Sequence, residues 1–259
     1  MKNNIRSLII IIGVISMTMT IHPQVIITAH RGASGYAPEN TMSSLKKAIE
    51  MGAEFCEIDV QETSDGILVL IHDSNYKRTC GVNKNVWEVR YEETKTFDCG
   101  KWFSEEFRYE RIPTLEQIIE SARGKIKLNI ELKTNGHEKL LAERVVEIVI
   151  KKNFSDNVII TSFDFNIIDK VKKNNPIIKA GYIFSGFSLI DVFSADIDVL
   201  SVNKAVVDED FVKKSRQYGK EVHVWTVNDA EDMKKLVDLG VSSIITNYPD
   251  RLKNILQNK

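Results

Sequence analysis

The sequence predicts an α/β fold in which eight parallel strands close into a barrel with helices outside it, the TIM (β/α)8 barrel. Past residue 24, short β-rich runs alternate with longer amphipathic helical patterns, which is typical of parallel sheets with helical crossovers. The chain has 259 residues, and barrels of this kind reach about 250 residues as one domain. No Pro, Gly or Ser-rich linker divides it, so we expect one domain over residues 25–259.

Nine runs are strand candidates, one more than the barrel needs. They cover residues 25–29, 55–62, 67–72, 127–132, 158–162, 179–184, 199–203, 222–226 and 243–246. Only Thr63-Ser64-Asp65-Gly66 separates the second run from the third, whereas a parallel connection needs about a dozen residues or more. We therefore expect an antiparallel hairpin with Asp-Gly in its turn, which leaves eight parallel strands. A turn centred on Ser64 and Asp65 would place His72 opposite Glu57.

Helical patterns lie between most of these runs, over residues 41–51, 138–152, 208–218 and 230–239. From residue 74 to 113 the pattern lapses into polar and aromatic sequence. It resumes where Thr114 and Gln117 offer a capping box for a helix that runs to Ala122. Aromatic residues such as Trp102 argue against disorder, so we interpret 74–113 as an insertion over the barrel mouth.

The overall charge excludes one class of partner. The chain has 35 Lys and Arg residues against 36 Asp and Glu residues, so it has no basic field of the kind that binds nucleic acid. We expect no nucleic-acid partner. Any anion that the protein binds must be held by a local cluster of charges.

Residues 1–24 have the layout of a secretory signal. Lys2 and Arg6 precede an apolar run over 8–14 that is too short for a comfortable membrane span. The alternative is an N-terminal helix or strand of the fold. No A-x-A pattern marks a cleavage site, so an uncleaved anchor stays open. We expect an exported protein, periplasmic or secreted, with membrane contact only through this segment if it is not cleaved.

The three cysteines do not indicate a zinc site. Cys56, Cys80 and Cys99 are odd in number and have no C-x-x-C spacing. Cys80 and Cys99 could pair in an oxidising compartment. Separate thiols, with Cys56 in the core, are the alternative.

The first strand ends in Ala29-His30-Arg31-Gly32. A histidine at a strand end is often only structural, but here an arginine and a glycine follow it. The Arg31 guanidinium matches the geometry of a phosphate, and Gly32 lets the backbone approach a ligand closely. These three residues therefore indicate an anion-binding site at the end of this strand.

Three carboxylates are expected to converge. Glu57 and Asp59 share one face of the second strand, because side chains alternate along a strand. Glu131 and Lys133 share a face at the end of the next barrel strand. An all-oxygen site suits a hard cation, Ca²⁺ or Mg²⁺, better than zinc, while Lys133 would help to neutralise a phosphate. A solvated polar face is the alternative.

These residues together resemble the glycerophosphodiester phosphodiesterase family over about residues 25–257. The motifs that carry the resemblance are H-R-G with P-E-N-T (30–41), E-x-D-V (57–60), D-G-x-x-V-x-x-H-D (65–73), E-x-K (131–133) and W-T-V-N (225–228). The resemblance implies a small insertion after the second strand. For the site it implies one divalent cation on Glu57, Asp59 and Glu131, acid and base roles for His30 and His72, and phosphate binding by Arg31 and Lys133.

The expected reaction is the hydrolysis of small-molecule glycerophosphodiesters to an alcohol and sn-glycerol 3-phosphate. The resemblance implies that the neighbouring glycerol hydroxyl attacks first and that water then opens a cyclic phosphate. Trp225, at the end of the seventh barrel strand, could pack against the glycerol or the alcohol, although a core tryptophan is the alternative. A phosphatidylinositol-type phospholipase C and a non-catalytic binding barrel are the competing functions. The head group, the ion, the roles of the two histidines and the oligomeric state stay open.

Overall fold

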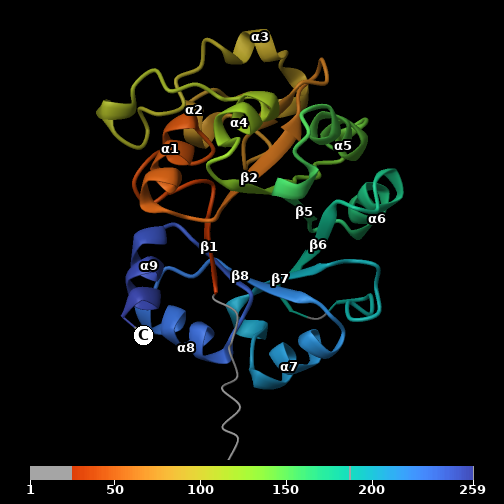
Figure 1. Ribbon diagram of the computed structural model, residues 1–259. Coiled ribbons are helices and arrows are strands. Elements are labelled where there is room, and N and C mark those ends of the chain that lie inside the picture. The colour runs from red at the N-terminus through yellow and green to blue at the C-terminus, as the bar shows by residue number, and fades with distance from the viewer. Residues whose placement is uncertain (1–24, 187, 259) are drawn as a thin grey trace, which may run out of the picture.

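The computed structural model describes residues 25–186 and 188–258. The expected signal segment, residues 1–24, lies outside the described residues. Strands surround a common centre and helices lie outside them (Figure 1). The strands are β1 (Ile26–Ala29), β2 (Phe55–Glu62), β3 (Leu68–Leu70), β4 (Lys127–Leu132), β5 (Val158–Ser162), β6 (Lys179–Phe184), β7 (Val199–Asn203), β8 (Glu221–Trp225) and β9 (Ser243–Thr246).

Eight of these strands close the barrel. Parallel pairs join β1 to β2, β2 to β4, and each following strand to the next up to β9, which pairs with β1. The remaining strand, β3, pairs antiparallel with β2, and its Val69 forms an isolated antiparallel bridge with Thr114. The predicted TIM barrel with a hairpin excursion after its second strand is therefore confirmed.

Most of the helices that cover the barrel begin at polar caps, α5 and α9 excepted. Thr41 forms a capping box with Ser44, and Asp208 and Asp229 accept hydrogen bonds from the first turns of their helices, as the sequence patterns there indicate. The barrel helices are α1 (Met42–Met51), α4 (Leu115–Ala122), α5 (Leu141–Lys151), α6 (Phe165–Asn174), α7 (Glu209–Gln217), α8 (Ala230–Leu239) and α9 (Pro249–Gln257).

The register predicted for the hairpin is wrong by one residue. Val60 pairs with Leu70 and Glu62 with Leu68, so the turn is centred on Asp65 and not between Ser64 and Asp65. The Thr63 amide donates to the Ile67 carbonyl, and Gly66 is left-handed at φ 80°. This is a three-residue hairpin loop that ends in a left-handed glycine. His72 therefore does not face Glu57 across the hairpin, and it follows the paired part of β3.

The barrel interior changes from apolar to polar along its axis. Phe55, Ile159 and Val199 form a buried apolar cluster near the starts of their strands. Polar pairs lie next to this cluster, where Thr28 hydrogen-bonds to Ser243 and Thr161 donates to Asn129. Polar side chains thus fill the level from which the catalytic end of such a barrel is built.

Residues 74–113 form a separate layer with its own short helices, α2 (Lys77–Cys80), α3 (Tyr91–Thr94), η1 (Val86–Glu88) and η2 (Glu105–Phe107). Their core joins Tyr76, Val86 and Val89 to the hairpin residues Val69 and Ile71. A disulfide links Cys80 to Cys99, whereas Cys56 is a buried free thiol. Closing a loop of this length stabilises a fold by about 3 kcal/mol.

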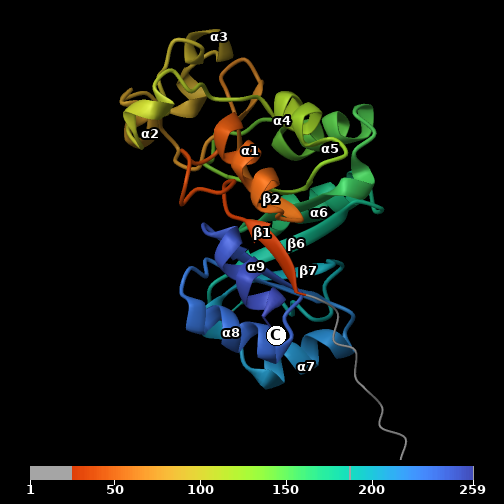
Figure 2. The same ribbon diagram turned by 60° about the vertical axis from the view of Figure 1, so that its left-hand side comes forward.

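Figures 1 and 2 both place α2 and α3 beyond α1 and α4, on the side opposite α7 and α8. The apolar core of this layer packs against the hairpin. Its residues Thr79 and Cys99 lie around one small pocket together with Glu39 and His72. That the insertion covers the barrel mouth stays a prediction.

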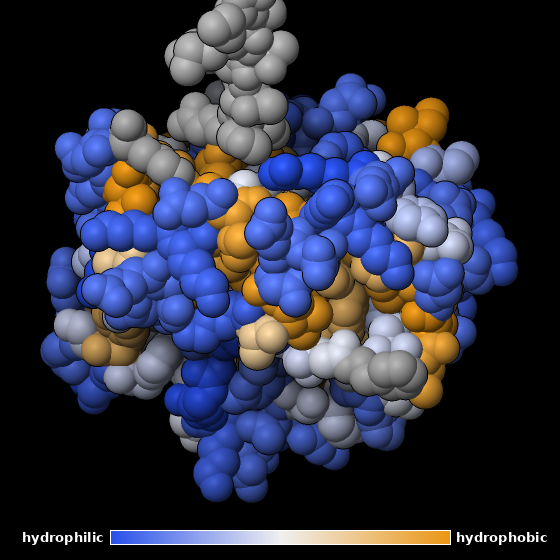
Figure 3. Space-filling model, turned by 90° about the horizontal axis from the view of Figure 1, so that it is seen from below, coloured by the Kyte–Doolittle hydropathy of each residue, from blue (hydrophilic) through white to orange (hydrophobic). Residues whose placement is uncertain are grey.

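The side of the molecule that carries α7 and α8 is mainly polar and charged (Figure 3). Hydrophilic side chains cover most of the face that carries α7 and α8, and patches of apolar residues lie among these hydrophilic side chains (Figure 3). A groove of about 1100 Å³ between these two helices is lined mainly by charged side chains, among them Lys213, Glu231 and Lys234. Within the described part of the chain, no helix is both long and apolar enough to cross a membrane.

The strand that carries Glu131 is anchored by its outward face. Leu128 of β4 is fully buried in the main core, so Leu128→Ala should lower the free energy of unfolding by about 2 to 5 kcal/mol through lost burial and a cavity. Leu189, which is 95% exposed, provides the matched control, and Leu189→Ala should leave it nearly unchanged. Denaturant unfolding measures both. Equal effects would contradict the assignment of Leu128 to the core.

Candidate active site

A strained turn after β1 carries His30 and Arg31. Arg31 has a left-handed backbone at φ 54°, and Gly32 follows at φ 78°. A Cβ on Gly32 would come within 2.4 Å of the Ser44 hydroxyl oxygen, so only glycine fits. The turn is held to β2, because the Arg31 amide donates to Glu57 Oε2 at 2.8 Å and the Gly32 amide donates to the Glu57 carbonyl at 3.2 Å. Such strain is typical of functional sites.

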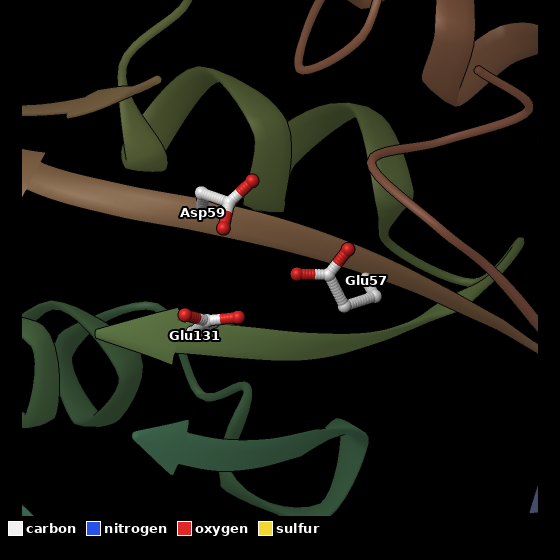
Figure 4. A group of neighbouring side chains, drawn as sticks. All are labelled: Glu57, Asp59 and Glu131. Atoms are coloured by element: carbon white, nitrogen blue, oxygen red, sulfur yellow. The ribbon is translucent and has the colours of Figure 1, made fainter. Parts of the chain in front are cut away.

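Three carboxylates meet where β2 runs beside the C-terminal half of β4. The parallel register pairs Asp59 with Glu131 and Glu57 with Asn129, so Glu57, Asp59 and Glu131 all point to the barrel interior. One oxygen from each lies within 4.8 Å of the others, and their carboxylates face one another across the gap between the strands (Figure 4).

This proximity changes the acidity of the three groups. Burial, with the charges of Asp59 and Glu131, raises the pKa of Glu57 well above its usual value. Burial and the neighbouring Asp59 raise the pKa of Glu131 to about 7. Burial acts to raise the pKa of Asp59 as well, but the Arg31 guanidinium and Lys133 ammonium outweigh it and keep that pKa low. Asp59 therefore carries the firmest negative charge of the three.

Two cations balance part of this charge. Arg31 Nε lies 3.3 Å from Asp59 Oδ2, and Lys133 Nζ lies 2.7 Å from Glu131 Oε1 and 3.7 Å from Asp59 Oδ1. Glu57 Oε1 is buried and has no hydrogen-bond partner among the described residues. A buried acceptor without a donor is costly. The all-oxygen donor set, its excess of negative charge and this unpaired oxygen fit a hard divalent cation.

Each histidine is oriented by an acceptor on its Nδ1. His30 Nδ1 lies 2.7 Å from Asn247 Oδ1, and His72 Nδ1 lies 2.8 Å from Asp73 Oδ1. With the Asn247 side-chain oxygen facing His30, both acceptors favour a proton on Nδ1 and leave Nε2 for other partners. Burial, with the charge of Arg31, lowers the pKa of His30 to about 4, so the ring is neutral at neutral pH.

One cavity of about 130 Å³ brings these groups together. Seven of the eight predicted site residues line it, namely His30, Arg31, Glu57, His72, Glu131, Lys133 and Trp225. The eighth, Asp59, is buried in the same carboxylate cluster. Among the residues that the structure describes, no member of the insertion 74–113 lines the cavity.

The apolar part of the cavity wall includes Ile183, Ile245 and the rings of Phe163 and Trp225, which meet edge to face at 5.6 Å. The Trp225 indole Nε1 is buried and has no hydrogen-bond partner within the described part of the chain. An indole at a cavity wall can contact an apolar ligand surface and also donate one hydrogen bond. The wall thus suits a ligand with both carbon and hydroxyl groups.

Sequence reasoning missed several residues that position these groups. Asn40 donates to Asp59 Oδ2 at 2.8 Å and accepts from the Asp59 amide at 3.0 Å; the sequence suggested it only as a cap. Asp73 belongs to the quoted motif but was given no role. Gln61 donates to the carbonyls of residues 71, 72 and 73. Asn247 could have been found as a polar residue at the end of the strand beside β1.

Solved structures define the class of protein. The chain superimposes on a phosphodiesterase from Oleispira antarctica in complex with the product sn-glycerol-3-phosphate, with a TM-score of 0.85, 30% identity and 90% of this chain and 97% of that chain covered. A glycerophosphodiester phosphodiesterase from Thermotoga maritima gives 0.72 at 28% identity, covering 90% and 99%. The barrel and its charged rim thus define a phosphoric diester hydrolase.

The sequence identifies the family. Residues 30–251 match the glycerophosphoryl diester phosphodiesterase family. A glycerophosphodiester phosphodiesterase from Caldanaerobacter subterraneus is 34% identical over 242 residues, covering 90% of this chain and 98% of that protein, and one from Bacillus subtilis is 30% identical over 282 residues, covering 96% of each. The chain belongs to the glycerophosphoryl diester phosphodiesterase family.

The raised pKa of Glu131 predicts how stability depends on pH when cations are removed. A carboxyl whose folded pKa is raised stabilises the fold below its ordinary value, here 4.5, and loses that contribution as pH rises through about 7. In excess chelator, the Tm of the wild-type protein should therefore fall across this window more steeply than that of Glu131→Gln. Thermal unfolding at several pH values measures this. Parallel curves for the two proteins would contradict the raised pKa.

Proposed function

We propose that this protein hydrolyses glycerophosphodiesters to an alcohol and sn-glycerol 3-phosphate. The observation that carries the proposal is the meeting of two oriented histidines, three carboxylates and two cations around one cavity of about 130 Å³. That cavity is small beside the range of about 300 to 1,000 Å³ typical of drug-sized ligands. Its size favours a compact phosphate and glycerol unit, and the product named for the Oleispira relative supports the same assignment.

In this proposal Glu57, Asp59 and Glu131 hold one divalent cation, Ca²⁺ or Mg²⁺. When bound, the cation neutralises charge on the phosphate and so favours attack at phosphorus. Arg31 and Lys133 bind phosphate oxygens from the same side of the cavity, since both already lie against Asp59. The Arg31 guanidinium can bind two oxygens at once, whereas the Lys133 ammonium acts as a point charge.

The two histidines move the protons. His30, neutral at neutral pH and fixed through Nδ1 by Asn247, offers Nε2 as the base that accepts a proton from the attacking glycerol hydroxyl. His72, fixed through Nδ1 by Asp73, donates a proton to the departing alcohol. Attack by the neighbouring hydroxyl produces a cyclic phosphate, which water opens with the two roles exchanged.

One aromatic residue of the cavity serves substrate recognition. Trp225 packs against the glycerol or the alcohol and donates its unpaired indole N–H.

We also propose that the protein is exported, periplasmic or secreted. The Cys80–Cys99 disulfide supports export, because disulfides persist mainly in oxidising compartments.

A divalent cation should be required. Incubation with excess chelator should abolish the release of sn-glycerol 3-phosphate from glycerophosphocholine, glycerophosphoethanolamine and glycerophosphoglycerol, and Ca²⁺ or Mg²⁺ should restore it. Glu131→Gln should need a higher cation concentration for half-maximal activity. Glu138→Gln is the matched control, because Glu138 lies in the segment that follows β4 but is not among the residues that line the cavity. Full activity in chelator would contradict the metal assignment.

The two histidines should act as one unit. His30→Ala and His72→Ala should each lower kcat by about 100-fold or more, as the loss of acid-base groups typically does. The double variant should lose far less than the product of the two single losses, because residues that share one step are not additive. Steady-state kinetics over a range of pH measures this. A His72→Ala variant with normal kcat would overturn the proposed mechanism.

A further inference from the structure

Arg78 of α2 joins two carboxylates from distant parts of the chain. Its guanidinium donates to Asp73 through Nε at 2.7 Å and Nη2 at 3.1 Å. It also donates to Glu39 through Nη1 at 2.9 Å and Nη2 at 2.7 Å. Two bonds to each of two carboxylates use the planar fork of an arginine and fix the three side chains relative to one another.

Each of these carboxylates continues into the candidate active site. Asp73 accepts from His72 Nδ1 at 2.8 Å, and Glu39 accepts from Arg31 Nη1 at 2.9 Å. Arg78 is therefore one residue removed from the histidine on one side and from the phosphate-binding arginine on the other. It does not line the cavity itself.

We propose that Arg78 is a positioning residue that sets the relative placement of His72 and Arg31, and that the Cys80–Cys99 disulfide holds Arg78 in place. The inference rests on the proposed function, in which His72 moves a proton and Arg31 binds the phosphate. It adds a residue outside the cavity on which the catalytic geometry depends. It also makes the activity of this chain depend on an intact disulfide.

The disulfide gives α2 a covalent anchor beside the apolar contacts of Tyr76. Helix α2 has four residues, and only Thr79 among them is buried, whereas isolated helices shorter than about 12 residues are marginal in water. Cys80, its last residue, is bonded to Cys99. The Cys99 carbonyl accepts from Trp102 Nε1 at 3.0 Å, and the Trp102 ring lies 5.8 Å from Arg78 Cζ. One covalent bond thus fixes both the helix that bears the guanidinium and the ring beside it.

Overall stability and positioning are separable roles for this arrangement. The Arg78 side chain is 42% exposed, so solvent screens its ion pairs and limits their contribution to the free energy of unfolding. A positioning role and a stabilising role therefore predict different results. Removing the guanidinium should lower activity while leaving the unfolding transition close to that of the wild type.

The first experiment compares Arg78→Ala and Arg78→Lys with Arg90→Ala. Arg90 is an insertion arginine whose Nε lies 3.8 Å from Asp65, and it serves as the matched control. Arg78→Ala should lower kcat/KM for glycerophosphocholine by about 10- to 100-fold, as misplaced catalytic groups do. Arg78→Lys should recover part of the loss, because it restores charge but not the fork. Arg90→Ala should match the wild type, and all Tm values should stay close together.

A double-variant cycle separates positioning from other effects. In a Glu39→Gln, Asp73→Asn background, Arg78→Ala should cause little further loss, because the contacts through which it acts are already weakened. Losses that multiply would overturn the inference. So would wild-type kcat/KM in Arg78→Ala.

The second experiment opens the disulfide with a water-soluble phosphine, which with one water molecule converts it to two thiols and a phosphine oxide. Reduction should lower kcat/KM of the wild type to about the level of Arg78→Ala and should have little effect on Arg78→Ala itself. A Cys80→Ser, Cys99→Ser variant should have the kcat/KM of the reduced enzyme, and the phosphine should not change it. This result would exclude an effect of the phosphine through Cys56. Unchanged activity after reduction would contradict the role of the disulfide.

The His72 Nδ1 proton, observed by NMR, tests positioning without turnover. Its signal should shift or broaden in Arg78→Ala but not in Arg90→Ala. If the wild type cleaves the substrate, His72→Ala does not, and Arg78→Ala changes neither the signal nor the rate, only this inference fails. If the wild type does not cleave glycerophosphodiesters, the proposed function fails, and an unchanged signal would then overturn the positioning role independently.

Discussion

The close approach of three buried carboxylates is the constraint on which the rest of this site depends. The parallel register of β2 and β4 sets Asp59 beside Glu131, and strand alternation brings Glu57 to the same face. Like charges at this distance are unfavourable in a low-dielectric interior unless cations or protons balance them. The surrounding structure supplies Arg31 and Lys133 in part, while burial and the neighbouring carboxylates still raise the pKa of Glu57 and of Glu131.

Much of the local backbone serves to keep this cluster in place. The left-handed turn after β1 lets the Arg31 amide reach Glu57, and Asn40, itself at φ 58°, holds Asp59 from both its side chain and its amide. The cost of these conformations is met by the helices and the apolar floor of the barrel, where stability is concentrated. Charged side chains at the edge of the insertion connect it to the site, whereas residues outside the insertion form the cavity wall.

The sequence predicted the strands well because their apolar runs are bounded by turn residues. It predicted the carboxylate cluster because side chains alternate along a strand, so that acidic residues two positions apart must lie on the same face. It failed where the outcome depended on a single local conformation or on distant partners. The hairpin register was decided by Gly66 taking a left-handed conformation. Asn247 meets His30 across 217 positions of sequence.

The central claim is that the carboxylate cluster is a cation site that holds protons when no cation is bound. Cation binding must then release protons, because a coordinating carboxylate is deprotonated. Calorimetric titration with Mg²⁺ or Ca²⁺ in buffers of different ionisation enthalpy counts these protons directly. The account predicts saturable binding at one site with release of about one proton per cation below pH 7, decreasing at higher pH and diminished in Glu131→Gln. Binding with no proton release at any pH, or no saturable binding, would contradict it.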